Sequence, residues 1–307
     1  MSRAALPESG DFPLRLVDER PLPRDWTGAV HVWDVDRTDL DTDLSSLRGL
    51  LRLPLELAID KRTVPGVVEV LRECRRGPGA RPAHVPLYFV TASPPQLEGV
   101  LRRRMLLDGL EPDGLVLKDQ LRLARRLEFA RLRSQVAYKL TALWRLLERL
   151  PAGAELVLVG DDWESDALVF ARLAAVQQGA LSGAALDAAL RAGGVRDVPR
   201  LRALAERASG RGRVRLACVL LTRGREPRDI AAHGPALRAA RDALQLAAVL
   251  LDHGLISTAG LERVARGMAE RWRRRRDVLE RSALDAAGRG LLRPETQEVS
   301  RRSLRGL

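Results

Sequence analysis

The sequence predicts an α/β protein with a three-layer, Rossmann-like fold, a central parallel sheet, no large cap domain and a C-terminal helical region. Short apolar runs recur at 29–34, 86–91, 114–117, 155–160 and 213–221, as is typical of strands buried on both faces of a parallel sheet. Helical patterns lie between the first four runs. Strands that alternate with helices favour right-handed βαβ crossovers and helices on both faces of the sheet.

The helices between the strands are predicted from their apolar spacing and their start signals. In the stretch from Pro65 to Cys74, a proline stands in the first turn, and Val67, Val70 and Leu71 recur at helical spacing. The same pattern predicts further helices at 95–107, 120–133, 138–150 and 166–175.

The chain divides into three parts by pattern. Residues 1–26 carry four prolines and little periodicity, which predicts an extended lead-in. Residues 27–235 form the α/β domain, with a helical insertion at about 184–208. Residues 236–307 form a helical extension packed on the core.

In that extension we expect one helix over 236–252 that stops at Gly254. A second helix is expected to be capped by Thr258, and its apolar stripe runs from Leu261 through Trp272 to Leu279.

Composition indicates a folded protein in a reducing compartment. The chain of 307 residues is 46% hydrophobic, and its two cysteines, Cys74 and Cys218, have no metal-ligand spacing. No apolar run approaches the length of a membrane span. We therefore expect a cytoplasmic protein, peripheral at most to a membrane surface, and a disulfide is disfavoured.

The formal charge of +12 suggests anionic partners, but most of the arginines alternate with acidic residues. All but three of the 52 basic residues are Arg, and the lysines are Lys61, Lys118 and Lys139. A lysine in this background indicates a position that needs a compact ammonium group. Nucleic acid is disfavoured as a partner but stays open, and the sequence does not determine the oligomeric state.

Polar residues follow three of the predicted strands and indicate the site. In a doubly wound sheet the ligand binds at the carboxyl ends of the strands. The residues at these ends, with the lysine at the start of the helix before the fourth strand, are Asp34, Asp36, Thr38, Thr91, Ser93, Lys139, Asp161, Asp162 and Asp166.

Clustered carboxylates need a neutralising cation, and oxygen ligands favour a hard ion such as Mg²⁺. A carboxylate can then attack phosphorus and form an aspartyl-phosphate, while a second one transfers protons. Hydroxyl and ammonium donors stabilise the charge on the transferring phosphoryl group. The pattern therefore indicates phosphoryl chemistry.

The order of these motifs resembles the haloacid dehalogenase superfamily of phosphohydrolases. The residues that carry the resemblance are DVDRT at 34–38, FVTAS at 89–93, Lys139 and the GDDWESD stretch at 160–166. The segments from 88 to 119 and from 138 to 174 more closely resemble the catalytic domain of the actin-patch-associated phosphatidate phosphatase family. The resemblance extends from about residue 29 to 180 and weakens beyond.

The resemblance implies roles for the first motif. Asp34 would be the nucleophile and a metal ligand. Asp36 would be the general acid and base and would ligate the metal through its backbone carbonyl. Thr38 would bind substrate. Arg37 departs from the family, which usually has an aspartate at that position, so the resemblance leaves substrate preference open.

The resemblance also implies roles for the later motifs. Thr91 would bind the phosphoryl group, with Ser93 close by, and Lys139 would neutralise the nucleophile and the phosphate. Asp161 would complete the magnesium site. Asp162 or Asp166 would be a further ligand or would hold the other ligands in place.

The spacing of the motifs leaves no room for an independent cap domain, because core elements fill the stretch from 94 to 138 and only 26 residues separate Thr38 from the helix at Pro65. Small-molecule phosphatases usually need a lid that excludes water. An open site favours a large substrate: a lipid at a membrane surface, a phosphoprotein or a nucleic-acid end.

Several alternatives remain. A noncatalytic protein of the same fold could use its basic surface on nucleic acid or membrane. A receiver domain is disfavoured by the order of the motifs, and a dinucleotide-binding domain by the lack of GxGxxG. The four histidines have no ligand spacing, and Lys118 is expected at the surface. The arginine run at 273–276 is expected to be a solvated face, with a membrane patch as the alternative.

Overall fold

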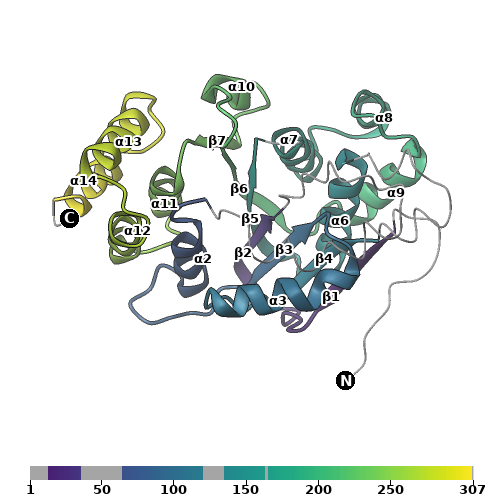
Figure 1. The fold of residues 1–307 in the computed structure, drawn as a ribbon. Coiled ribbons are helices and arrows are strands. Elements are labelled where there is room, and N and C mark those ends of the chain that lie inside the picture. Colours follow the sequence, from purple (N-terminus) through teal and green to yellow (C-terminus); the bar gives the residue numbers. More distant parts are fainter. Residues whose placement is uncertain (1–12, 36–63, 120–134, 163–164, 306) are drawn as a thin grey trace, which may run out of the picture.

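The computed structural model describes residues 13–35, 64–119, 135–162, 165–305 and 307. Within these ranges seven strands form one sheet in the order β1-β4-β3-β2-β5-β6-β7 (Figure 1). All neighbouring strands are parallel except β1 and β4, which are antiparallel. The bounds are Leu14–Asp18 (β1), Thr27–Asp34 (β2), Leu87–Thr91 (β3), Gly114–Lys118 (β4), Gly153–Asp161 (β5), Arg213–Leu220 (β6) and Leu237–Ala240 (β7).

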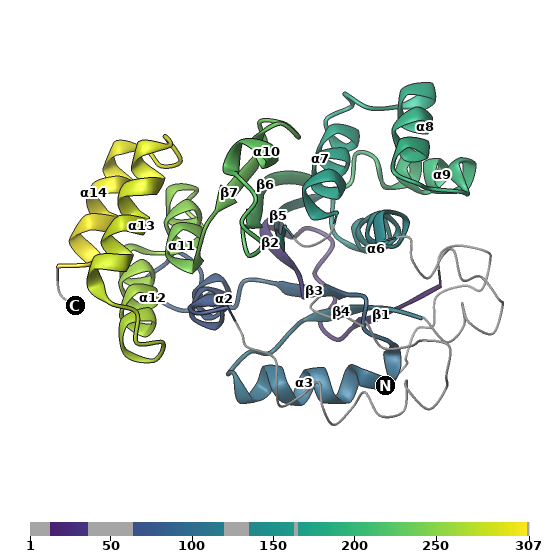
Figure 2. The same ribbon diagram turned by 45° about the horizontal axis from the view of Figure 1, so that its top comes forward.

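Helices cover both faces of this sheet and make three layers, as the sequence predicts (Figures 1 and 2). One face packs on α6 (Gln135–Arg149), α7 (Asp166–Gln177), α8 (Gly183–Ala192), α9 (Val198–Ala208) and the short α10 (Pro227–Ala231). The other face packs on α2 (Val67–Arg76), α3 (Glu98–Leu107) and α11 (Ala243–Asp252). A 3-10 turn, η1 (Pro95–Leu97), precedes α3.

The central strand β2 shows why the predicted strands are continuous apolar runs. Its residues alternate between the two faces, with Val30 and Val32 in the core under α6 and Trp33 in the core under α2. Both faces are buried along its second half, and apart from the buried His31 the run Val30–Trp33 is apolar up to the carboxyl end of the strand, where Asp34 stands. The five predicted strands all form, as β2, β3, β4, β5 and β6.

The sheet begins earlier in the chain than expected. Residues Leu14–Asp18, within the predicted lead-in, form β1 and pair with β4. Only Leu16 of this strand is buried. An edge strand with one buried side chain has too weak a pattern to be recognised among prolines.

The sheet also ends later than expected, because the helix predicted over 236–252 is wrong at its start. Leu237–Ala240 form β7, and Asp242 then caps α11 by accepting a hydrogen bond from the Gln245 amide at 2.9 Å. Alanine-rich sequence favours helix, and only the pairing with β6 makes this segment a strand.

The C-terminal helices α12 (Thr258–Glu270), α13 (Arg276–Gly288) and α14 (Pro294–Ser303) lie outside α11 (Figure 2). Ser257, not Thr258, caps α12. The predicted stripe from Leu261 to Leu279 is broken, because α12 ends before Trp272 and Arg273 has a positive φ. The arginine run at 273–276 is exposed on this connection and on the first residue of α13.

Helix α12 contacts α2, which lies about 190 positions earlier in the chain. Arg263 donates two hydrogen bonds to the carboxylate of Glu73, at 2.7 and 2.6 Å. The Trp272 indole donates to Glu69 at 3.3 Å instead of packing in the expected stripe. Gly66, which precedes α2 with φ +88°, leaves room for Met268, because a Cβ there would lie 2.7 Å from its Cγ.

Candidate active site

The polar strand ends meet at one edge of the sheet, as predicted. Asp34, Thr91 and Asp161 are the last residues of β2, β3 and β5. The three strands are parallel neighbours, and the register pairs Asp34 with Val90 and Trp33 with Val159. Side chains separated by more than 50 positions therefore emerge beside one another at the carboxyl edge.

Lys139 connects the carboxylates at this edge. Its Nζ atom lies 2.9 Å from Oδ2 of Asp34 and 2.5 Å from Oδ1 of Asp166. The Lys139 and Asp34 side chains are 2% and 5% exposed, and that of Asp166 is 0% exposed. The ammonium group is thus buried between two carboxylates, where the loss of either partner would leave a charge poorly solvated.

Asp166 holds the cluster together from the start of α7. One carboxylate oxygen accepts from Lys139 and the other accepts from the Asp161 amide at 3.0 Å. Gly160 makes this approach possible, since a Cβ there would lie 2.1 Å from Asp166 Oδ2. The glycine of the GDxxxxD pattern therefore makes room for the carboxylate of its second aspartate, Asp166.

Thr91 and Ser93 are both buried beside this cluster, at 1% and 4% exposure. The Thr91 hydroxyl accepts a hydrogen bond from the Ser93 amide at 3.1 Å, which fixes the turn after β3. The Tyr138 hydroxyl donates to the backbone carbonyl of Thr91. Sequence reasoning missed Tyr138, although it stands directly before Lys139 in the same helix.

Asp162 has a different environment from its neighbours. Its carboxylate accepts hydrogen bonds from the Thr222 amide at 2.7 Å, the Thr222 hydroxyl at 3.0 Å and the Arg223 amide at 3.0 Å. The Asp162 amide donates to the Leu220 carbonyl at 3.2 Å. The side chain therefore joins the end of β5 to the segment after β6, a contact that the sequence did not suggest.

Lys118 is not the surface residue that was expected. It is 0% exposed at the end of β4, and its Nζ lies 5.3 Å from the centre of the Tyr138 ring. At this distance an ammonium group is attracted to the face of an aromatic ring. Lys118 thus packs behind the tyrosine that holds Thr91.

Asp36, Arg37 and Thr38 lie outside the described residues, so the geometry of the first motif is known only at Asp34. Within the described ranges, no three His, Cys, Asp or Glu side chains form a metal-binding group. The carboxylates of Asp34 and Asp161 come from neighbouring strands. Mg²⁺ is commonly held by one or two carboxylates with waters and substrate phosphate, so this donor set fits it.

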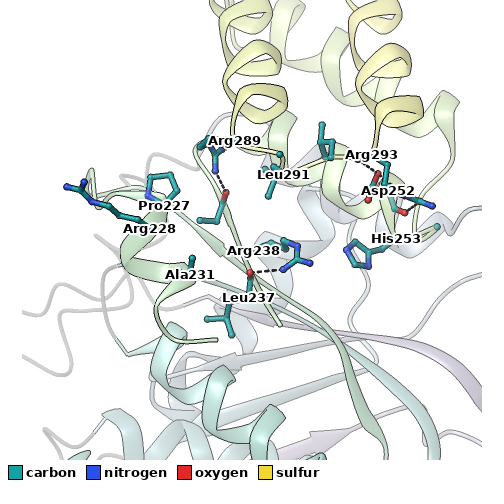
Figure 3. Close-up of a pocket in the computed structure, with 14 residues that line it drawn as sticks. Pro227, Arg228, Ala231, Leu237, Arg238, Asp252, His253, Arg289, Leu291 and Arg293 are labelled. Atoms are coloured by element: carbon teal, nitrogen blue, oxygen red, sulfur yellow. Dashed lines mark hydrogen bonds and ion pairs between the residues drawn. The ribbon is translucent and has the colours of Figure 1, made fainter. Parts of the chain in front are cut away.

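A separate concavity lies beside β7, α10 and the link between α13 and α14 (Figure 3). Arg228, Arg238, Arg289 and Arg293 line it. Burial and the guanidinium of Arg238 lower the pKa of His253 there. The first residue of β7 lines this concavity and no predicted site residue does, so it is not the site at the carboxyl edge.

Comparison with known proteins identifies the class of this domain. A family model described as "Phosphatidate phosphatase APP1, catalytic domain" matches residues 30–185, just over half of the chain. No curated protein and no solved structure matches. The matched region contains most of β2, all of β3 to β5 and the cluster around Lys139, so the protein is an α/β protein with a phosphatase domain. The chain belongs to the APP1 phosphatidate phosphatase catalytic-domain family.

No helix in the described part of the chain is long and apolar enough to cross a membrane. Cys74 and Cys218 are both free and buried.

Proposed function

We propose that the protein is a magnesium-dependent phosphatase of the haloacid dehalogenase type, which hydrolyses phosphatidate or another large phosphorylated substrate through an aspartyl-phosphate. The chain of contacts from Asp34 through Lys139 to Asp166 carries this proposal. The ammonium group of Lys139, buried between two carboxylates, offsets their negative charge and fixes Asp34 at the strand end. An ionised carboxylate at a fixed position is what a nucleophile requires.

The first step transfers the phosphoryl group to Asp34. A carboxylate oxygen of Asp34 attacks phosphorus as the bond to the leaving oxygen breaks. Asp36 donates a proton to that oxygen, so the leaving group departs as a neutral hydroxyl. In the second step Asp36 takes a proton from water, which attacks the same phosphorus, releases inorganic phosphate and regenerates Asp34.

Lys139 and the turn after β3 hold the phosphoryl oxygens during both steps. The Lys139 ammonium beside Asp34 offsets negative charge on the nucleophile and on the phosphoryl group. Thr91 lies at the end of the neighbouring strand, where its hydroxyl and the Ser93 hydroxyl are the donors for these oxygens. Thr38 would supply a further donor.

Asp34, Asp161 and the backbone carbonyl of Asp36 would hold the magnesium ion. When bound, the ion neutralises the charge between the carboxylates and the phosphate. Asp166 then acts by keeping Lys139 and the Asp161 backbone in position. We assign Asp162 the same kind of positioning role, because its oxygens accept hydrogen bonds from the segment after β6.

The experiment is release of phosphate from phosphatidate with Mg²⁺ and after its removal by a chelator. The wild type is compared with Asp34→Asn, and with Asp197→Asn, an exposed carboxylate on the link before α9. We expect magnesium-dependent release by the wild type and Asp197→Asn and none above background by Asp34→Asn. Equal, metal-independent background from all three would overturn the proposal in favour of a noncatalytic binding protein.

A further inference from the structure

The segment after β6 emerges beside the candidate site. Residues Thr222–Glu226, which we name the β6 loop, follow the strand that pairs with β5. The register places Leu220 opposite Asp161, at the carboxyl edge. Because β5 lies between β2 and β6, the loop begins one strand beyond Asp161 and two strands beyond Asp34.

The loop is held at its first end by its backbone. The Asp162 carboxylate, in a residue only 2% exposed, accepts from the amides of Thr222, Arg223 and Arg225 at 2.7, 3.0 and 3.4 Å. Gly224 has φ +78°, which lets the chain curl around the carboxylate. The Thr222 hydroxyl also donates to this carboxylate, at 3.0 Å, whereas Arg223 and Arg225 bind it through their backbone amides.

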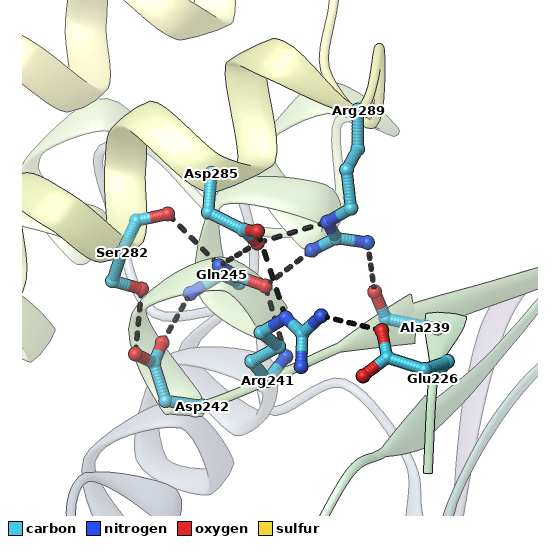
Figure 4. A network of polar contacts seen from close by, with 8 residues as sticks. All are labelled: Glu226, Ala239, Arg241, Asp242, Gln245, Ser282, Asp285 and Arg289. Carbon is cyan, nitrogen blue, oxygen red and sulfur yellow. Dashed lines mark hydrogen bonds and ion pairs between the residues drawn. The ribbon is translucent and has the colours of Figure 1, made fainter. Parts of the chain in front are cut away.

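The loop is held at its second end by the C-terminal helices (Figure 4). The Glu226 carboxylate accepts from Arg241 at 3.0 Å, and Arg241 also forms an ion pair of 3.5 Å with Asp285 of α13. Arg289 and Gln245 each donate to the Asp285 carboxylate, at 2.8 and 3.0 Å. The network thus fixes the loop against β7, α11 and α13.

The β6 loop carries two exposed cations between its two anchors. Arg223 and Arg225 are both exposed. Within the described part of the chain, the Arg225 guanidinium forms no ion pair. The acidic residues around the loop have other partners: Asp162 binds the loop backbone, Glu226 binds Arg241, and Asp229 accepts from the Glu226 amide. The loop therefore presents positive charge on a fixed backbone.

We propose that the β6 loop is a contact for an anionic lipid surface, in which Arg223 and Arg225 bind phosphate groups of the lipids that surround the substrate. This inference rests on the proposed function, because it assumes that the scissile phosphate is part of a lipid. When a lipid phosphate enters the site from a membrane, the phosphates of neighbouring lipids lie in the same plane of the membrane surface. These phosphates would contact the β6 loop beside Asp161. Guanidinium groups bind phosphate through paired hydrogen bonds.

The binding test uses vesicles of phosphatidylcholine and phosphatidylglycerol that contain no phosphatidate. Co-sedimentation is measured for the wild type, Arg225→Ala and the double variant Arg223→Ala/Arg225→Ala. A basic residue at an anionic surface contributes enough to change binding about five-fold, so we expect roughly five-fold weaker association for Arg225→Ala and about 25-fold weaker association for the double variant. The matched control is Arg81→Ala, an exposed arginine in the link between α2 and β3 at the opposite edge of the sheet.

Unchanged binding in the double variant, or an equal loss in Arg81→Ala, would overturn the proposal. Binding that depends on the two arginines in a protein without phosphatase activity would sustain the lipid contact and refute the proposed function. If the enzyme is active, hydrolysis on anionic vesicles is compared with hydrolysis of a dispersed short-chain phosphatidate. We expect the ratio of the two rates to fall in the double variant, and a parallel fall of both would show that the arginines bind the substrate itself instead.

Discussion

Lys139 and Asp34 lie 105 positions apart in the chain, yet the Nζ atom of one is 2.9 Å from Oδ2 of the other. The pair is buried. Lys139 lies in α6 and Asp34 in β2, and the two elements pack in the same hydrophobic core. The chemical character of the candidate site follows from this pair.

Replacement of Lys139 tests the pair directly. Lys139→Met should abolish most of the phosphatase activity and also destabilise the fold by about 3 kcal/mol, because two buried carboxylates lose their cation. Phosphate release and chemical unfolding measure the two effects. Lys139→Arg should restore charge but little activity, since a planar guanidinium does not reproduce a compact ammonium between two carboxylates. Full activity in Lys139→Met would contradict the assignment.

Gly160 is expected to be indispensable for the position of Asp166. A Cβ at residue 160 would meet Asp166 Oδ2 at 2.1 Å, so Gly160→Ala should displace that carboxylate and with it Lys139. We expect a loss of stability of about 1–3 kcal/mol and at least a ten-fold loss of activity. Thermal unfolding and phosphate release are the measurements.

The matched control for that substitution is Gly99→Ala in α3, where a Cβ meets nothing within 4 Å. Alanine is the better helix former, so this variant should be slightly more stable than the wild type. Similar losses in both variants would indicate that the contact with Asp166 has no special importance.

The hold of Asp162 on the β6 loop can be measured by proteolysis. Asp162→Ala removes the acceptor for the amides of Thr222 and Arg223 and should cost about 1–3 kcal/mol of stability. Trypsin should then cleave after Arg223 and Arg225 faster than in the wild type, as mapped by mass spectrometry of the first fragments. This role would be refuted if trypsin cleaved the β6 loop of Asp162→Ala no faster than that of the wild type.

The buried His31 should make the free energy of unfolding depend on pH. The residue is 0% exposed in the middle of β2, and burial lowers the pKa of its imidazole to about 3. The unfolded state, with a pKa near 6.5, therefore binds the proton more readily than the folded state. Stability should fall as the pH drops below about 6.5, by roughly 2 kcal/mol at pH 5 from this group alone.

The pH dependence is measured by chemical unfolding between pH 5 and pH 7.5. His31→Leu should flatten the curve in that range, because no proton is taken up at this position on unfolding. His233→Gln, which changes an exposed histidine, is the control and should leave the slope unchanged. A wild-type slope retained in His31→Leu would assign the acid sensitivity to other groups.

The strands that sequence reasoning found are those buried on both faces. Short runs rich in valine and aromatic residues, such as the one ending at Asp34, are typical of strands in the middle of a parallel sheet. The two edge strands were missed for the opposite reason. β1 buries one side chain, and β7 is four residues of a helix-favouring segment, so each is a strand only because a neighbour supplies its hydrogen bonds.

The candidate site divides in the same way. The sequence identified Asp34, Thr91, Lys139, Asp161 and Asp166, because residues at strand ends and helix starts converge once the order of elements is known. It did not reveal that Tyr138 holds the Thr91 carbonyl or that Lys118 is buried behind it. These contacts depend on distances between elements, which no local pattern records.

The sequence by itself determined the α/β class, the edge at which the site lies and the residue types that the chemistry needs, since these follow from periodicity and from the order of motifs. Only the tertiary structure decided how the acidic residues divide their work. Asp166 binds Lys139, whereas Asp162, four positions earlier, binds the β6 loop. The physical reason is that α7 turns one carboxylate toward β2 and the end of β5 turns the other toward β6, a choice made by packing.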